Sequence, residues 1–191
     1  MNIYDPYPET IELDGKEYRL NMDFSRVLRV IDLSDDPGLT TADRIELQAR
    51  LLLADDRDCP EDINAQARLV AAAMDLIPKG EDSGKPKERY IDFHQDAAMI
   101  RSAFFRIGVD LTRDRLHINQ FLELLGDLPS DTALMRTIDI RRKPIPKPTK
   151  HNAEQIAELQ AAKARVAIKL SEEERRAQFA ESLKNSTVLR G

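Results

Sequence analysis

Three histidines, one cysteine and several adjacent carboxylates are the side chains of this 191-residue chain that could do chemistry. The histidines are His94, His117 and His151, and none stands four residues from a second metal ligand. A zinc site needs three or four such ligands, so the pair of His94 and Asp96 does not predict one. Asp96 is expected instead in the first turn of a helix, where the helix dipole favours an anion.

Nucleophilic and nucleotide sites are not indicated either. Cys59 has no histidine near it in the sequence and precedes a proline, which favours a place at the entry to a helix. The segment Gly80–Pro86 resembles a phosphate-binding loop, but it is one residue short, and its final proline replaces the Ser or Thr that holds magnesium. The pairs Asp35-Asp36 and Asp55-Asp56 lie in polar stretches, where burial does not tune a carboxyl pKa. We therefore expect no enzyme, metal or cofactor.

The composition indicates a thin hydrophobic core beneath a heavily charged surface. Hydrophobic residues make up 41% of the chain, charged residues make up 33%, and tryptophan is absent. A typical globular chain has about 25% charged residues. The net charge of −5 is uneven, because residues 1–90 sum to −8 and residues 91–191 to +3. An acidic total argues against a protein that coats nucleic acid, while a local basic contact stays open.

The expected compartment follows from three further features of the sequence. A single cysteine excludes an intrachain disulfide, which is typical of a reducing compartment. The N-terminus has no apolar core of a signal peptide. No stretch approaches the roughly 18 apolar residues that a membrane span needs. We therefore expect a cytoplasmic protein without membrane contact.

The spacing of apolar residues predicts a mainly α fold, a helical bundle with a small N-terminal β-hairpin and extended C-terminal helices. Asp14-Gly15 between alternating runs predicts the hairpin over 10–21, because both turn residues must adopt positive φ. Beyond it the apolar period is 3.6 residues, and short loops favour antiparallel neighbours. The inward stripes expected for the first and third helices are Phe24, Val27, Leu28 and Ile31, and Ile63, Ala67, Val70, Met74 and Ile77.

Composition divides the chain into four segments. Residues 1–80 are expected to hold the hairpin and the first helices, and residues 81–89, rich in Pro, Gly and charge, to form a linker. Residues 90–140 are expected to form a helical core. Residues 141–191 combine a basic, proline-rich segment with a helical tail. We expect residues 150–191 to be weakly attached, because their apolar stripes are poor.

The stretch 141–150 is the most strongly charged feature of the sequence. Pro144, Pro146 and Pro148 forbid a helix there and favour extended, polyproline-like backbone. The stretch holds five basic residues and no acidic one. A solvated spacer, a contact with an acidic protein surface and a contact with phosphate are all open. The absence of interleaved aromatic residues disfavours base stacking.

Two neighbouring stretches carry a resemblance to a known family. The matching pieces are Asp92-Phe93, Gln95-Asp96, Phe104 and Asp110-Leu111 within Tyr90–Leu111, and Leu116-His117, Phe121, Leu128-Pro129, Asp131-Thr132 and Arg141 within Leu116–Lys147. On these pieces the chain resembles the bacteriophage gene-product-fifteen family of tailed phages and prophages. The gene of that family typically lies between those of the major tail protein and the tape measure protein. Its members look like tail assembly chaperones.

The resemblance implies a function in protein binding and none in catalysis. A tail assembly chaperone is implied to bind the long helical tape measure protein, to keep it soluble, and to yield to tail tube subunits that polymerise around it. Contact with the tail tube protein and self-association are open under this interpretation. Two alternatives compete with it. One is a nucleic-acid-binding phage accessory protein that uses residues 141–150 and Arg175-Arg176, and the other is a structural component retained in the tail.

Three groups of residues are candidates for the partner contact. The first group is apolar and would line a groove for a partner helix, although packing in the core is the favoured alternative for each member: Phe104, Ile118, Phe121 and Leu125. The second group falls outside the packing stripes and is expected to be partly exposed: Met99, Phe105 and Leu124. The third group adds positive charge: Arg141, Arg142 and Lys143.

Overall fold

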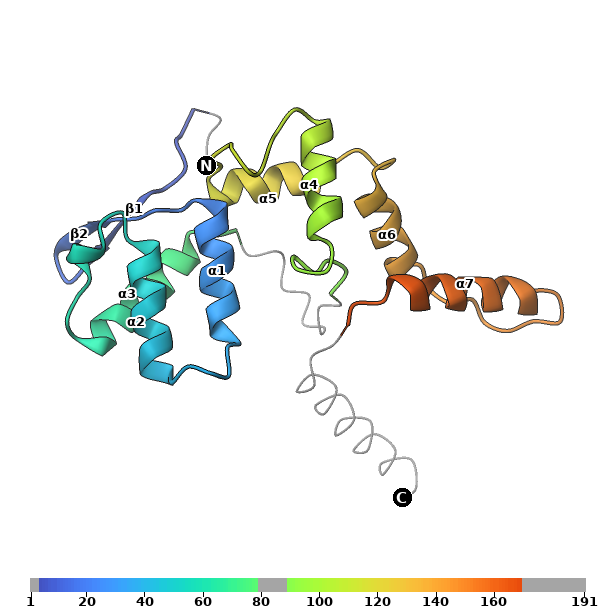
Figure 1. Ribbon diagram of the computed structural model, residues 1–191, viewed down its shortest axis with the longest axis horizontal. Helices are drawn as coiled ribbons and strands as arrows, with labels where there is room; N and C mark the ends of the chain where they lie inside the picture. Colours follow the sequence, from blue (N-terminus) through green and yellow to red (C-terminus); the bar gives the residue numbers. More distant parts are fainter. Residues whose placement is uncertain (1–3, 79–88, 170–191) are drawn as a thin grey trace, which may run out of the picture. The chain divides into compact units, whose positions relative to one another are not determined.

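The fold is mainly helical, as the apolar periodicity predicts, and the computed structural model describes residues 4–78 and 89–169 (Figure 1). Within these ranges the elements are β1 (Thr10–Leu13), β2 (Lys16–Arg19), α1 (Phe24–Ser34), α2 (Thr41–Leu52), the 3₁₀ helix η1 (Asp56–Asp58), α3 (Ile63–Asp75), α4 (Ala97–Arg106), α5 (Ile118–Gly126), α6 (Ala133–Arg142) and α7 (Ala153–Val166). The linker predicted at 81–89, except for its last residue, and the part of the predicted helical tail beyond residue 169 lie outside the described residues. No helix in the described ranges is long and apolar enough to cross a bilayer.

The chain divides into two compact units. The N-terminal unit comprises Met1–Pro86 and Gly108–Asp127, and the second unit comprises Lys87–Ile107 and Leu128–Gly191. The segment 90–140, expected to form one helical core, is therefore shared between the two units. Its helix α5 belongs with the N-terminal unit, and its helices α4 and α6 belong with the second.

The hairpin is built as its turn residues predict. Asp14 and Gly15 have φ angles of 53° and 75°, and they connect β1 to its antiparallel partner β2. Ile11 stands opposite Tyr18 in this register, and both side chains are buried. One face of the hairpin therefore covers the core of the N-terminal unit.

Backbone hydrogen bonds fasten the segment after β2 to two helices that are distant in the sequence. Asn21 N donates to Leu52 O at 2.7 Å, at the C-terminal end of α2. Ile118 N donates to Met22 O at 2.8 Å, at the first residue of α5. The second of these bonds ties α5 to the N-terminal unit, although nearly a hundred residues separate the bonded groups.

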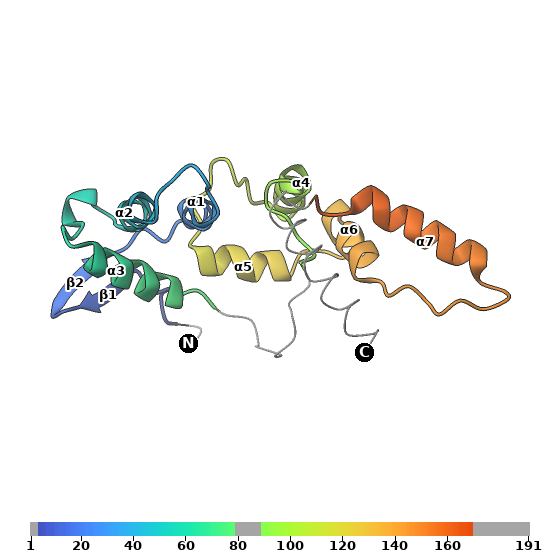
Figure 2. The same ribbon diagram turned by 90° about the horizontal axis from the view of Figure 1, so that it is seen from below.

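Helices α1 and α2 form one layer of the N-terminal unit, and α3 and α5 lie beneath them (Figure 2). Phe24 on α1 and Phe121 on α5 stack with ring centroids 4.7 Å apart and an interplanar angle of 11°. Val27, Leu52 and Leu69 bring α1, α2 and α3 into the same core, and all three are fully buried. This core positions the exposed faces of α1 and α2.

The predicted stripe of the first helix is confirmed at Phe24 and Val27, which are buried, but not at Ile31, and the third helix buries a different face from the one predicted. In α1, Val30 is buried and Ile31 is 41% exposed. In α3, Leu69 is buried with Gln66, and Ile63 is 37% exposed. Gln66 is held inside because its amide donates to Pro60 O at 2.7 Å, and apolar periodicity does not register a buried polar side chain.

Helix α4 of the second unit begins at Ala97, with Asp96 as its N-cap. Asp92 and Gln95 have the spacing of a capping box, which by itself would place the start of the helix four residues earlier. Asp92 Oδ1 accepts from His94 N at 2.9 Å and from Gln95 N at 2.7 Å. These bonds close a turn ahead of the helix, and the carboxylate of Asp96 is left for another partner.

Helix α7 contains no buried residue, and the segment before it is exposed. We therefore expect limited trypsin digestion of the folded chain to cut after Arg142 or Lys150, or within the tail, before it cuts in the region 91–138. Lys143 and Lys147 precede prolines, and trypsin does not cleave such bonds. Mass spectrometry of the first fragments checks this. Cleavage after Arg101 in α4 at an equal rate would contradict the weak attachment of the tail.

Candidate partner-binding site

The four residues expected to line a groove are core residues instead. Phe104 is 0% exposed, Ile118 and Phe121 are 1% exposed, and Leu125 is 9% exposed. Phe104 packs inside the second unit, and the other three pack inside the N-terminal unit. All four side chains therefore pack in the core of their own unit, and none of them is open to a partner.

The three residues expected to be partly exposed do reach the surface. Phe105 is 70% exposed, and Met99 and Leu124 are half-buried. On α4, Phe105 follows the exposed Arg101 and Ser102 by four and three residues, which places them on one helix face. We name this surface the Phe105 face. It presents a large aromatic ring beside a cation, on a helix whose opposite side is buried.

Arg141 is the centre of a buried network in the second unit. Its side chain is 6% exposed, and that of Asp96 is 0% exposed. Nη1 and Nη2 of Arg141 donate to the two carboxylate oxygens of Asp96 at 2.5 and 2.9 Å, a bidentate pair. Nη1 also donates to Tyr90 O at 2.8 Å, and Nε donates to Val166 O at 2.6 Å. Arg141 therefore joins α6 to the segment before α4 and to the end of α7, which is a structural task.

Arg142 and Lys143 begin an exposed, extended segment, as the prolines predict. Asn152 shapes its far end, where Oδ1 accepts from Thr149 N at 2.7 Å and Nδ2 donates to Lys147 O at 3.0 Å. Within the described residues, no acidic side chain forms an ion pair with Lys143 or Lys147. The segment therefore presents its positive charge to solvent.

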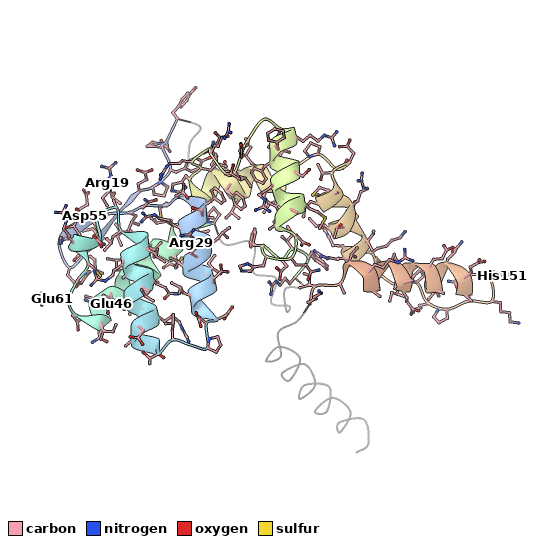
Figure 3. All side chains as sticks on the ribbon, viewed as in Figure 1. Arg19, Arg29, Glu46, Asp55, Glu61 and His151 are labelled. Atoms are coloured by element: carbon pink, nitrogen blue, oxygen red, sulfur yellow. The ribbon has the colours of Figure 1, made fainter. Side chains whose placement is uncertain are left out.

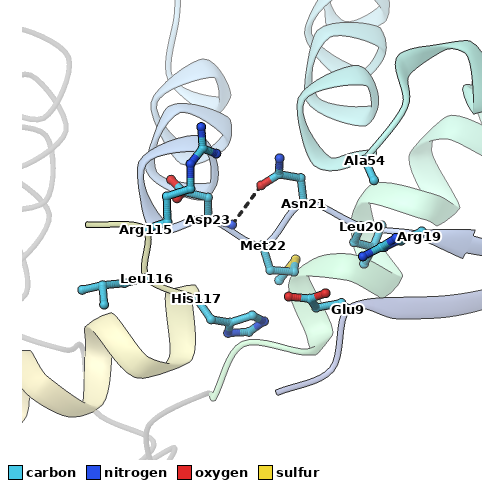
Figure 4. Close-up of a pocket in the computed structure, with 10 residues that line it drawn as sticks. All are labelled: Glu9, Arg19, Leu20, Asn21, Met22, Asp23, Ala54, Arg115, Leu116 and His117. Carbon is cyan, nitrogen blue, oxygen red and sulfur yellow. Dashed lines mark hydrogen bonds between the residues drawn. The ribbon is translucent and has the colours of Figure 1, made fainter. Parts of the chain in front are cut away.

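An open cavity of about 300 Å³ lies in the N-terminal unit, between the end of β2 and the segment before α5 (Figure 4). Arg19, Arg115 and His117 are among the side chains that line it. His117 Nδ1 accepts from Asn119 N at 3.1 Å, so Nε2 carries the proton and donates to Pro8 O at 3.2 Å. The imidazole caps α5 and holds the N-terminal segment, and neither nitrogen is free for acid–base chemistry.

The surroundings of Cys59 and Asp96 indicate that neither side chain takes part in catalysis or metal binding. Burial raises the pKa of the Cys59 thiol, whereas reactive cysteines have a lowered pKa. Asp96, considered with His94 for a metal, is engaged by Arg141. In the part of the chain that the structure describes, no three His, Cys, Asp or Glu side chains gather as metal ligands. The phosphate-loop-like segment 80–86 lies outside the described residues.

A second surface, which the apolar stripes did not single out, lies between α1 and α2 (Figure 3 labels Arg29 on the first and Glu46 on the second). Two open cavities of about 440 and 420 Å³ adjoin there, and they share Arg29, Leu47 and Leu51. Leu33 completes an apolar floor. We name this surface the α1–α2 groove. The four-residue spacing of Leu47 and Leu51 is the sequence signal that could have revealed it.

Comparisons with known proteins place the chain in a family. Among curated proteins and among solved structures, nothing matches it. Residues 3–168 match the family described as Bacteriophage Gp15 protein. The match spans β1 to α7, and therefore both units and every element described above. Because it covers most of the 191 residues, the chain belongs to the Bacteriophage Gp15 protein family.

Proposed function

We propose that this phage protein is a tail assembly chaperone of the host cytoplasm, which binds the tape measure protein reversibly and catalyses nothing. Family membership supports a task in the phage life cycle, and the implied position of the gene beside the tape measure gene supports this one. The observation that carries the proposal is the Phe105 face. A phenylalanine that is 70% exposed on a well-packed helix is the kind of anchor that protein interfaces bury.

The Phe105 face suits a helical partner that must later be released. Burying one phenylalanine side chain contributes about 1.5–3 kcal/mol to binding. Arg101, exposed one helical turn before Phe105, offers a charge-assisted contact to a carboxylate of the partner. One aromatic anchor with one charged neighbour is a modest contact, so tail tube subunits could displace the chaperone.

The substitution Phe105→Asp is expected to weaken the complex with the tape measure protein at least tenfold, because it replaces the anchor by a charge that must be desolvated. The measurement is an affinity titration of the two purified proteins. Ile63→Asp, on α3 of the N-terminal unit, makes a similar change at a residue that is 37% exposed, and it should bind like the wild type. If the wild type and both variants bound equally well, the Phe105 face would not be part of the contact.

A nucleic-acid-binding accessory function is the second candidate, and the exposed basic segment supports it. Arg142, Lys143, Lys147 and Lys150 lie within nine residues and are all exposed. Neutralising phosphates with such residues would give an affinity for DNA or RNA that falls steeply with salt. A retained structural component, the third candidate, would be present in purified virions, whereas a chaperone would be absent from them.

A further inference from the structure

We propose that the 143–150 segment, which lies between α6 and α7, binds an acidic segment of a partner protein that also carries aromatic side chains. This segment lies outside the Phe105 face. The inference therefore goes beyond the tape measure contact, and it does not depend on the chaperone function. Three properties of the segment define its partner: a backbone held in extended form, an apolar face, and positive charge without an acidic partner.

Proline holds the backbone of the segment in extended form before any partner arrives. From 143 to 148 every residue is a proline, whose φ is fixed, or precedes one and so avoids helical backbone. Lys143 has a φ of −58° and a ψ of 121°, which is polyproline-like backbone. Asn152 holds the far end through its bonds to Lys147 O and Thr149 N. A partner therefore does not have to order this backbone when it binds.

An extended backbone of this kind has three faces, because residues three apart lie one above the other. Ile145 and Pro148 share one face, and Ile145 is 49% exposed. Lys143 and Lys147 lie on the other two faces, one on each side of the apolar one. Aliphatic and proline side chains on such a backbone pack on the aromatic rings of proteins that recognise it. We therefore assign aromatic side chains to the partner.

The positive charge of the segment has no acidic partner. Lys143, Lys147 and Lys150 are exposed, and within the described ranges their side chains form no hydrogen bond or ion pair. Glu154 and Glu158 are exposed on the helix that follows, α7, and neither of them pairs with these lysines. Three unpaired cations on a preformed backbone favour a partner that carries carboxylates.

Nucleic acid competes for the same positive charge, but three features favour a protein. The segment has no aromatic side chain on which a base could stack. A phosphate backbone has no apolar group to cover the face of Ile145 and Pro148. The net charge of the chain is −5, which repels a long polyanion. An acidic protein segment with aromatic side chains satisfies both the lysines and the apolar face.

Binding of three labelled probes to the full-length protein, followed by fluorescence anisotropy, tests the proposal. The first probe is a 12-residue peptide with six glutamates and two tyrosines, the second replaces the tyrosines with serines, and the third is a single-stranded oligonucleotide with six phosphates. We expect the first to bind at least fivefold more tightly than either of the others. No binding of the first peptide, equal binding of the two peptides, or tighter binding of the oligonucleotide would overturn the proposal. None of these outcomes bears on the chaperone function.

A variant without the prolines tests whether the shape of the backbone matters. Replacing Pro144, Pro146 and Pro148 together by alanine keeps every charge and releases the backbone. Its affinity for the first peptide is expected to fall at least fivefold, because the partner must then order the segment. An unchanged affinity would show that charge alone is recognised, and it would contradict the proposal.

Single substitutions identify the side chains that are responsible. Lys147→Glu is expected to weaken binding of the first peptide at least tenfold, and Ile145→Ser to remove the preference for the peptide with tyrosines. Lys169→Glu makes the same charge change at an exposed lysine outside the segment, and it should bind like the wild type. All three side chains are exposed, so the fold is retained. If Lys147→Glu and Lys169→Glu bound equally well, or if Ile145→Ser kept the preference, the segment would not be the binding surface that we propose.

Discussion

Replacing Arg141 with alanine is expected to destabilise the second unit by about 3–5 kcal/mol, because it strands the buried carboxylate of Asp96 without its cation. The carbonyl groups of Tyr90 and Val166 lose a donor in the same change. Loss of these bonds should release the segment before α4 and the end of α7 together. Hydrogen exchange read by mass spectrometry, peptide by peptide, measures the effect where it occurs.

Two further variants test whether stability depends on the hydrogen bonds of Arg141 or only on its positive charge. Arg141→Lys keeps the positive charge but loses the bidentate geometry. The stability of its second unit should therefore lie between those of the wild type and the alanine variant. Arg142→Ala removes the neighbouring cation, whose guanidinium lies 5.6 Å from the centre of the Tyr90 ring at an exposed site. That change should cost only about 0.5–1 kcal/mol. If Arg141→Ala and Arg142→Ala had equal effects, the network would not hold the second unit together.

Replacing Phe121 with alanine is expected to destabilise the N-terminal unit by about 3–5 kcal/mol, because it leaves a cavity where the ring stacks on Phe24. A loss of about 4 kcal/mol raises the opening equilibrium of the surrounding backbone roughly a thousandfold. Hydrogen exchange in α1 and α5 reports that opening directly. A local readout is preferable to one melting temperature, because a chain of two units need not unfold in a single step.

Phe105→Ala is the matched control for the Phe121 prediction. It removes the same ring from a side chain that is 70% exposed, so stability should change by less than about 0.5 kcal/mol. If Phe105→Ala destabilised the protein as much as Phe121→Ala, the ring of Phe105 would be part of a core and not of a partner surface.

The hairpin and several helix starts were predictable because their causes lie within a few residues. Asp14 and Gly15 set a turn with positive φ without help from the rest of the chain. Asp23 and Thr40 each accept a backbone N–H from the first turn of the helix they begin. The exposure of Phe105 was predictable on the same grounds, because it falls beside the buried stripe of α4.

Contacts between distant residues were not predictable from these patterns. Asp96 and Arg141 are 45 residues apart. In the sequence, Asp96 is explained as an anion in the first turn of a helix, and Arg141 is explained as one cation of a basic stretch, so neither residue indicates the other. Their pairing depends on how α4 packs against α6. The assignment of α5 to the N-terminal unit likewise depends on backbone bonds such as that from Ile118 to Met22, which apolar periodicity does not encode.

The most direct test of the chaperone account is the solubility of the tape measure protein when its gene is expressed with and without this one. Without its chaperone, a long helical protein with uncovered apolar stripes should aggregate. The account predicts that the tape measure protein is soluble only in the presence of this protein, and that the two elute together on gel filtration. Equal solubility in both cases, with no complex surviving gel filtration, would contradict it.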